Sequence, residues 1–261
     1  MGDELNVLVS DRTIPKIREI CTNITKEWVP KFKEHLTVYA QFRGVPVEVF
    51  KDTDLFEFDD ADGIVNIDDK ATDLNTLQGR VIFPIKDCNG MVMGFSGYNP
   101  EKSPKYLDTL TYGYMPRFST FYGLELIKKY LEDNKAGIPL FITEGIVDCL
   151  IIRYLGFNCI SLLGSNMNKI VDEIMTYTFG YYIADNDDNK TGEKFVLNSI
   201  RRHKSYISYI YKNKYRKNGE LDLKVKDTND AYIIWGEGKL KSVFEGIKNF
   251  IYFKNDIMES I

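Results

Sequence analysis

Acidic side chains follow three apolar, strand-like runs in the second half of the chain. Glu144 follows IPLFIT, Asp185 and Asp187 follow FGYYIA, and Asp227 and Asp230 follow LDLKVK. One acid after a strand is often a helix cap, but acidic loops gathered at one sheet edge repel one another unless a cation lies among them. Oxygen ligands without His or Cys suit Mg²⁺ or Mn²⁺, which work with substrate phosphates. We therefore expect a metal-dependent phosphoryl-transfer site, with a response-regulator-like or purely structural acidic edge as the alternative.

The elements that must position these acids alternate between strand and helix patterns from residue 138 onward. Such alternation predicts an α/β fold with a largely parallel sheet and covering helices, and ligands then bind beyond the carboxyl ends of the strands. The expected strands are 138–143, 158–163, 179–184 and 221–226, and the expected helices are 146–155, 168–177 and a stretch after Glu193.

The first half of the chain does not show this alternation of strands and helices. Apolar spacing predicts a helix over 13–42, and the acidic, Gly-containing stretch 51–70 is expected to be a loop-rich boundary. RVIFPI and MVMGFSGY, joined by the turn-forming KDCNG, predict a β-hairpin. The Gly-, Pro- and Tyr-rich stretch that follows is typical of an ordered functional loop, with a plain surface loop as the alternative.

Composition excludes several classes of protein. With 261 residues, 44% of them hydrophobic, the chain is expected to bury a core rather than to be disordered or fibrous. No apolar run is long enough to span a bilayer, and MGDELNVLVSDR lacks the order of a signal peptide, so we expect a soluble, cytoplasmic protein with no membrane partner. Four cysteines without a CxxC pair, together with only two histidines, effectively exclude a structural zinc finger, and no zinc is expected.

The net charge of −4 conceals one basic segment. RRHKSYISYIYKNKYRK, residues 201–217, contains seven Lys or Arg, several Tyr and no acid. Interleaved Tyr and cations could stack bases while neutralising a single strand. The alternative is a cationic amphipathic helix on the surface.

The motifs resemble those of a known family. Glu144-Gly145-Ile146-Val147-Asp148 resembles EGxxD, and Asp185-Asn186-Asp187 resembles DxD, of the TOPRIM fold found in DnaG-type primases, topoisomerases, RecR and OLD-type nucleases. Upstream, GRVIFPIKDCNGMVMGFSG, SPKYL and FYGLE are similar in wording and order to the segment that precedes TOPRIM in DnaG-type primases, and KDTND resembles the KDxND form common in phage primases. The resemblance covers about residues 79 to 235.

The resemblance implies a TOPRIM domain, a mostly parallel sheet flanked by helices, preceded by a mixed α+β basic primase subdomain. The implied segments are an N-terminal helical and acidic region at 1–76, the basic subdomain at 77–134, the TOPRIM domain at 135–236 and a C-terminal helical tail at 237–261.

The resemblance also implies a role for each matching residue. Glu144, Asp185 and Asp187 would be catalytic, and the same three with Asp227 and Asp230 would hold the metal. Gly145 and Asp148 would support them. The residues implied to bind nucleotide or nucleic acid, taken with the cations of the 201–217 segment, are Arg80, Lys86, Lys105, Tyr106, Arg117, Arg201, Arg202 and Lys204.

The implied function is that of a DNA primase, which makes short RNA primers from ribonucleoside triphosphates on single-stranded DNA with Mg²⁺ or Mn²⁺. The expected partners are the DNA template, a replicative helicase and a separate zinc-bearing subunit, and a bacteriophage source is plausible. A TOPRIM metal-dependent nuclease and a non-catalytic, helicase-binding subunit are the alternatives.

Two of the motifs depart from the family pattern. Bacterial members usually continue FGG with Arg, whereas this chain has FSG followed by Tyr98. The acidic loop from Asp185 to Gly192 carries two extra residues, which puts the identity of the metal ligands in question.

Overall fold

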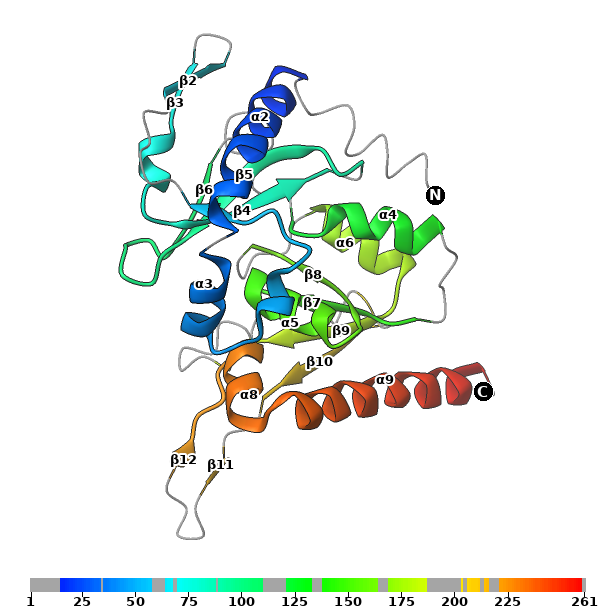
Figure 1. Cartoon of the computed structure of the whole chain (residues 1–261). Helices are drawn as coiled ribbons and strands as arrows, with labels where there is room; N and C mark the ends of the chain where they lie inside the picture. The colour runs from blue at the N-terminus through cyan, green and yellow to red at the C-terminus, as the bar shows by residue number, and fades with distance from the viewer. Residues whose placement is uncertain are drawn as a thin grey trace. The chain divides into compact units, whose positions relative to one another are not determined.

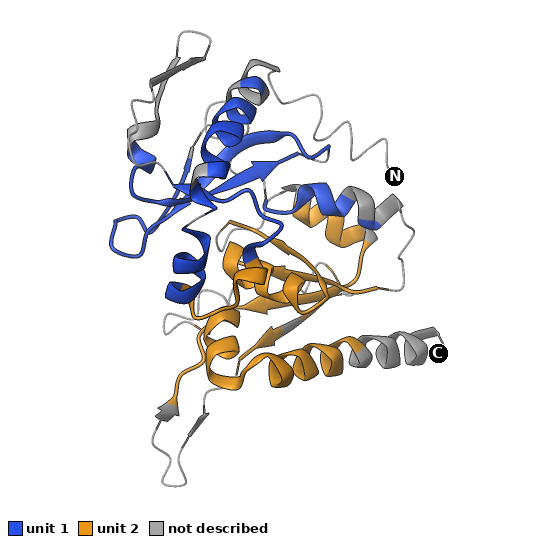
Figure 2. Cartoon of the chain, viewed as in Figure 1, with its two compact units in different colours: residues 1–42, 50–135, 168–170 blue, residues 43–49, 136–167, 171–261 orange. Residues whose placement is uncertain are grey.

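The computed structural model describes residues 15–33, 35–57, 64–67, 70–87, 89–109, 121–132, 138–163, 169–186, 203, 206–211, 214–215 and 221–259. The chain divides into two compact units (Figure 2). Unit 1 comprises residues 1–42, 50–135 and 168–170, and unit 2 comprises residues 43–49, 136–167 and 171–261. This division is coarser than the four segments expected from the sequence, which stay a prediction.

Unit 1 is built on an antiparallel sheet of order β1-β4-β5-β6. Its strands are β1 (Phe56–Glu57), β4 (Val81–Lys86), β5 (Val92–Tyr98) and β6 (Tyr106–Thr109). A separate hairpin joins β2 (Ile64–Ile67) to β3 (Lys70–Asp73). The helical elements in the first half of the chain are α2 (Pro15–Phe32), α3 (Leu36–Arg43), η1 (Val47–Phe50), η2 (Leu74–Leu77) and α4 (Leu124–Glu132). Residues 43–49, which include the end of α3 and most of η1, belong to unit 2.

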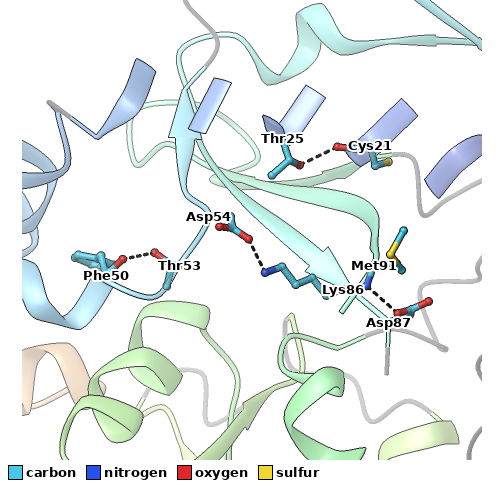
Figure 3. Close-up of polar contacts among 8 residues, drawn as sticks. All are labelled: Cys21, Thr25, Phe50, Thr53, Asp54, Lys86, Asp87 and Met91. Atoms are coloured by element: carbon cyan, nitrogen blue, oxygen red, sulfur yellow. Dashed lines mark hydrogen bonds and ion pairs between the residues drawn. The ribbon is translucent and has the colours of Figure 1, made fainter. Parts of the chain in front are cut away.

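The hairpin predicted from RVIFPI and MVMGFSGY is confirmed as β4 and β5. Its turn is held by Asp87, whose fully buried side chain accepts a hydrogen bond of 3.0 Å from the backbone N–H of Met91 (Figure 3). Gly90 supplies the left-handed backbone, with φ of 78°, that closes the turn. The helical segment expected over about 13–42 consists of two helices, α2 and α3, and the acidic stretch 51–70, expected to be loop-rich, contains β1, β2 and the first residue of β3.

Unit 2 contains the predicted parallel sheet, with strand order β10-β9-β7-β8 and every neighbouring pair parallel. The central strands β7 and β9 are buried along their whole length, because helices of the same unit cover the sheet. The elements are β7 (Leu140–Thr143), α5 (Ile146–Tyr154), β8 (Asn158–Ser161), α6 (Lys169–Tyr177), β9 (Gly180–Ala184), β10 (Tyr206–Ile210), α8 (Thr228–Trp235) and α9 (Glu237–Glu259).

The C-terminal helix α9 packs on this sheet (Figure 1). The ring of Phe244 lies edge-on to Phe141 of β7, with 5.3 Å between the ring centroids. The hydroxyl of Tyr181 in β9 donates a 2.6 Å hydrogen bond to the carbonyl of Ile247. Leu240 and Phe244, in the expected helical tail, therefore belong to the hydrophobic core of unit 2. No helix in the part of the chain that the structure describes is long and apolar enough to cross a bilayer.

The fourth strand of the parallel sheet is β10, so the expectation that residues 221–226 form it was wrong. β12 (Leu221–Leu223) instead pairs antiparallel with β11 (Lys214–Tyr215). The surface helix considered for the basic segment is also wrong where the structure describes it, since β10 lies within that segment. Tyr206 of β10 is buried, and its hydroxyl lies 2.6 Å from Thr178 Oγ1. Its ring can therefore pack in the core while its hydroxyl group stays hydrogen-bonded.

Replacement of Gly180 by Ala should lower the free energy of unfolding by about 2 kcal/mol or more. A Cβ atom at this position would lie 1.8 Å from the carbonyl oxygen of Leu140, which is backbone and cannot turn aside. The matched control is Gly246→Ala in α9, where a Cβ atom would meet nothing within 4 Å and should stabilise the helix by up to about 1 kcal/mol. Urea unfolding of the two variants measures both effects, and equal stability would contradict the close approach of β7 and β9.

Candidate active site

The candidate site lies where β7 and β9 end side by side. The two strands are parallel neighbours, with Thr143 opposite Ile183, so the residues that follow them emerge at the same edge of the sheet. From β7 the chain crosses to β8 on one side, and from β9 it continues to β10 on the other. Such a reversal opens a crevice at the carboxyl ends of the two strands. Glu144 and Asp185 are the residues that follow β7 and β9 at this point.

The loop that follows β7 is held from both sides. Ser161 at the end of β8 donates a 3.0 Å hydrogen bond from its hydroxyl to the carbonyl of Glu144, and Thr143 donates another of 3.0 Å to the carbonyl of Gly145. A Cβ atom at Gly145 would lie 2.6 Å from Oδ2 of Asp148, so a larger residue here would displace that carboxylate. The EGxxD pattern thus encodes a close approach of the Asp148 carboxylate to the backbone.

Asn186, the middle residue of the DxD motif, fixes the loop that follows β9. Its backbone N–H donates a 2.7 Å hydrogen bond to the carbonyl of Lys226. Its side-chain amide donates to the carbonyls of Tyr211, at 3.1 Å, and Val225, at 3.2 Å. These bonds join the end of β9 to the KDTND segment, and sequence reasoning assigned Asn186 no role.

The KDTND segment forms the start of α8. Asp227 is the N-cap residue, and its Oδ1 accepts a 2.9 Å hydrogen bond from the backbone N–H of Asp230. Asp230 Oδ2 in turn accepts a 3.2 Å hydrogen bond from the backbone N–H of Lys226. Both acids therefore stabilise the helix start as well as placing negative charge at the site.

Asp148 is the most deeply buried of the site's carboxylates that the structure describes and is 8% exposed. Burial, followed by repulsion from Asp227 and Asp185, holds its pKa well above the usual range. Its Oδ1 accepts a 2.9 Å hydrogen bond from the backbone N–H of Asn229, whose side chain donates at 2.9 Å to the carbonyl of Arg43. Asn229 is thus a second positioning residue. It is the Asn of the KDTND motif, to which sequence reasoning assigned no role.

The acids influence one another across the site. Burial raises the pKa of Asp227, repulsion from Asp230 adds to this, and the N–H of Asp230 opposes it. Burial also raises the pKa of Tyr182, on β9, and the charges of Glu144 and Asp185 raise it further. The acidic loops therefore lie close enough together for the charge of one to raise the pKa of groups on another.

Two cations offset part of this repulsion. The ammonium nitrogen of Lys226 lies 3.6 Å from Oδ2 of Asp185. The guanidinium of Arg43, at the end of α3, lowers the pKa of both Asp148 and Asp227. The pKa of both carboxyl groups nevertheless stays raised, with burial as the largest cause, and a divalent cation among them would favour their charged forms.

The donor set fits such a cation in its chemistry, since it consists of carboxylates and no soft ligand. Within the described residues, no group of three or more His, Cys, Asp or Glu side chains is arranged to hold a metal ion. Asp187, one of the expected ligands, lies outside the described residues. The metal-binding roles of Glu144, Asp185, Asp187, Asp227 and Asp230 therefore stay a prediction.

In unit 1, Arg80 does not fit a direct contact with phosphate. It is 3% exposed, and its guanidinium donates hydrogen bonds of 2.9 Å to the carbonyls of Pro104 and Lys105 and one of 3.3 Å to that of Thr76. With its donors directed at backbone carbonyls, Arg80 positions the SPKYL segment. A role for Arg80 in nucleic-acid binding would act through Lys105 and its neighbours.

The other expected basic-subdomain residues are more accessible. Lys105 is exposed, and Tyr106 is 41% exposed and lies opposite Tyr98, with 4.8 Å between ring centroids. Lys86 pairs with Asp54 at 2.5 Å (Figure 3). Expected binding residues outside the described part of the chain are Arg117, Arg201, Arg202 and Lys204.

Asp227→Asn should be at least as stable as the wild type, whereas Asp227→Ala should lose about 1 kcal/mol. Asn keeps the N-cap hydrogen bond and removes a negative charge that burial and repulsion disfavour. Ala removes the same charge but also loses the N-cap hydrogen bond. Urea unfolding of the three proteins measures the difference. Equal destabilisation by Asn and Ala would show that the charge of Asp227, rather than its cap, stabilises the fold.

Sequence comparison relates the chain to DNA primases. Residues 33–128 match the family described as DNA primase catalytic core, N-terminal domain. The DNA primase of Thermotoga maritima is 24% identical over 184 residues, covering 69% of this chain and 30% of the relative, and that of Buchnera aphidicola is 27% identical over 146 residues, covering 53% and 25%. The matched segment is thus less than a third of either relative's length.

Structural comparison extends the likeness to nearly the whole chain. The RNA polymerase domain of Mycobacterium tuberculosis primase DnaG superposes with a TM-score of 0.66 at 12% identity, covering 90% of this chain and 84% of that one. A DnaG primase catalytic domain bound to single-stranded DNA gives 0.64 at 16% identity, covering 94% and 83%. The chain is related to the DnaG-type DNA primases and has the fold of their catalytic core.

Proposed function

We propose that this chain is the catalytic core of a DNA primase that synthesises short RNA primers from ribonucleoside triphosphates on single-stranded DNA. The observation that carries the proposal is the placement of Glu144 and Asp185 at the ends of adjacent parallel strands, within a fold shared with DnaG catalytic cores. The DnaG domain described as bound to single-stranded DNA supports the choice of template.

The proposed chemistry assigns each acid a role. Asp185 and Asp187 would hold a divalent cation with help from Asp227 and Asp230, and Glu144 would act as general acid or base or as a further ligand. The cation, Mg²⁺ or Mn²⁺, would lower the pKa of the attacking 3′-hydroxyl and balance charge on the triphosphate.

Residues around these acids would keep them in place during the reaction. The side chain of Asn186 donates hydrogen bonds to backbone carbonyls. Asn229 donates its backbone N–H to the Asp148 carboxylate and its side-chain amide to the carbonyl of Arg43. Gly145 leaves room for Asp148, whose buried carboxyl group supports Asn229. Because these loops are already ordered, binding of the cation and substrate would not have to supply the free energy for positioning the acidic side chains.

The template would contact the basic subdomain. Exposed Lys105 can contact phosphates, and the exposed ring of Tyr106 can stack on a base. Lys86 and, outside the described residues, Arg117, Arg201, Arg202 and Lys204 are proposed to add phosphate contacts. Arg80 is left as the residue that positions this segment.

The remaining expectations are part of the same proposal. A replicative helicase and a separate zinc-bearing subunit would supply template selection, because no zinc ligands are expected in this chain. A bacteriophage source and action in the bacterial cytoplasm fit the KDTND form and the composition, and they stay predictions.

Primer synthesis should be lost in the double variant Asp185→Asn/Asp187→Asn. The reaction uses circular single-stranded DNA, labelled ribonucleotides and Mg²⁺, with and without a candidate replicative helicase. Removal of two charges from the proposed ligands should lower product formation by about 100-fold or more, since a bound metal contributes several kcal/mol to the transition state.

The matched control for this variant is Glu48→Gln/Asp52→Asn, which removes two charges from exposed carboxylates outside the site. It should synthesise primers at the wild-type rate. Cleavage of the supplied DNA without nucleotides would move the assignment to a TOPRIM nuclease. DNA binding without either reaction would favour the non-catalytic subunit.

Addition of Mg²⁺ or Mn²⁺ should raise the melting temperature of the wild type without nucleotide or DNA. A ligand that binds only the folded state stabilises it by about 2.7 kcal/mol at 100 times its dissociation constant. Asp185→Asn/Asp187→Asn should reduce this shift, and Glu48→Gln/Asp52→Asn should not. An equal shift in all three proteins would place the cation elsewhere, whatever the outcome of the primer assay.

A further inference from the structure

A second site lies wholly within unit 1, between α3 and the β5–β6 connection. It is a pocket of about 210 Å³, and its lining includes Tyr39 and Phe42 from α3, Glu57 from β1, Gly79, Tyr98 from β5 and Glu101. This volume is below the range of roughly 300–1,000 Å³ usual for whole small-molecule ligands. The pocket is of a size to receive one or two side chains. None of the proposed catalytic or metal-binding residues lines it.

The helix wall of the pocket exposes apolar side chains. Phe42 is 64% exposed, and Val38, one turn earlier on α3, is 65% exposed. Beneath them Tyr39 is 7% exposed, stacks on Phe42 at a centroid distance of 6.5 Å and contacts Phe50 at 5.1 Å. Exposed large apolar groups that adjoin a pocket mark interaction surfaces, and an aromatic ring on a buried support is already ordered for contact.

The part of the pocket formed by Gly79 and the β5–β6 connection is fixed by hydrogen bonds. The side-chain amide of Asn99 donates at 2.6 Å to the carbonyl of Gly79, and the ammonium of Lys102 donates to the carbonyl of Gln78. Arg80 holds the far end of the same connection through the carbonyls of Pro104 and Lys105. A preformed pocket of this kind binds without the cost of ordering its own walls.

The charge of the pocket selects the kind of partner. Glu57 and Glu101 are the charged residues among the lining side chains, and the ammonium of Lys102, which donates to the carbonyl of Gln78, lies beside Gly79. Two carboxylates and one ammonium leave a net negative charge, which disfavours a nucleic-acid phosphate and favours Lys or Arg. Apolar walls with acidic groups at the same pocket are complementary to a polypeptide with an apolar side chain beside a basic one.

We propose that this pocket is a docking site for a partner protein, which inserts an apolar side chain against Phe42 and Tyr98 and places an adjacent Lys or Arg against Glu57 and Glu101. None of the proposed catalytic residues lines the pocket, although Tyr98 contacts Tyr106, which is proposed to stack on a template base. The pocket therefore provides a contact for a partner in replication without using the groups that would perform primer synthesis.

The test uses the full chain and a phage-displayed library of short random peptides. Selection on the wild type should enrich sequences in which an aromatic or aliphatic residue adjoins Lys or Arg. A fluorescently labelled peptide from this set is then titrated against variants by anisotropy. Phe42→Ser and Glu57→Gln/Glu101→Gln should each weaken its binding by about tenfold or more.

The matched control is Met91→Ser, which removes an exposed apolar side chain, 41% exposed, at the β4–β5 turn of the same unit. It should bind the peptide as the wild type does, and circular dichroism should show all variants folded. Phe42→Ser should also retain wild-type primer synthesis on bare template, which separates this site from the catalytic one.

The proposal is overturned if the selected peptides lack the apolar-basic pattern, or if they bind the pocket variants and the wild type equally. It is also overturned if Phe42→Ser weakens binding of a labelled oligothymidine while no peptide is selected. In that case the pocket would receive a nucleic-acid base.

Discussion

The close parallel pairing of β7 and β9 is the constraint on which the candidate site depends. Gly180 begins β9 directly against the backbone of Leu140, where no side chain would fit. The pairing brings the ends of the two strands to one edge, and the chain leaves them in opposite directions. Glu144 and Asp185 become neighbours as a consequence of strand order, although 40 positions separate them in the numbering.

The second constraint is electrostatic. A buried carboxylate is costly unless hydrogen bonds and opposite charges offset the loss of water. Here the backbone N–H of Asn229 satisfies one oxygen of Asp148, and Arg43 and Lys226 supply positive charge. The pKa of Asp148 is nevertheless held high by burial and by its acidic neighbours. A site that keeps such repulsion in the folded state is suited to a cation and to the phosphates that accompany it.

Unit 1 uses its charged residues differently. Arg80, which the family pattern places among the phosphate contacts, is buried and directs its donors at backbone carbonyls of the SPKYL segment. The exposed side chains are instead those of Lys105 and Tyr106 on that segment and of Phe42 on α3. One buried cation thereby orders both a surface suited to nucleic acid and a wall of the pocket suited to a protein.

The sequence by itself determined the parallel sheet, the β4–β5 hairpin and the order of the acidic motifs, because these depend on short-range periodicity and on turn residues such as those around Asp87. It failed at β10, since a run of Tyr, Lys and Arg is amphipathic in either a helix or a strand, and only pairing with β9 decides between them. The tertiary structure alone assigned Asn186 and Asn229 their positioning roles and buried Arg80. Hydrogen bonds to distant carbonyls leave no local pattern in the sequence, because both partners become defined only when the chain has folded.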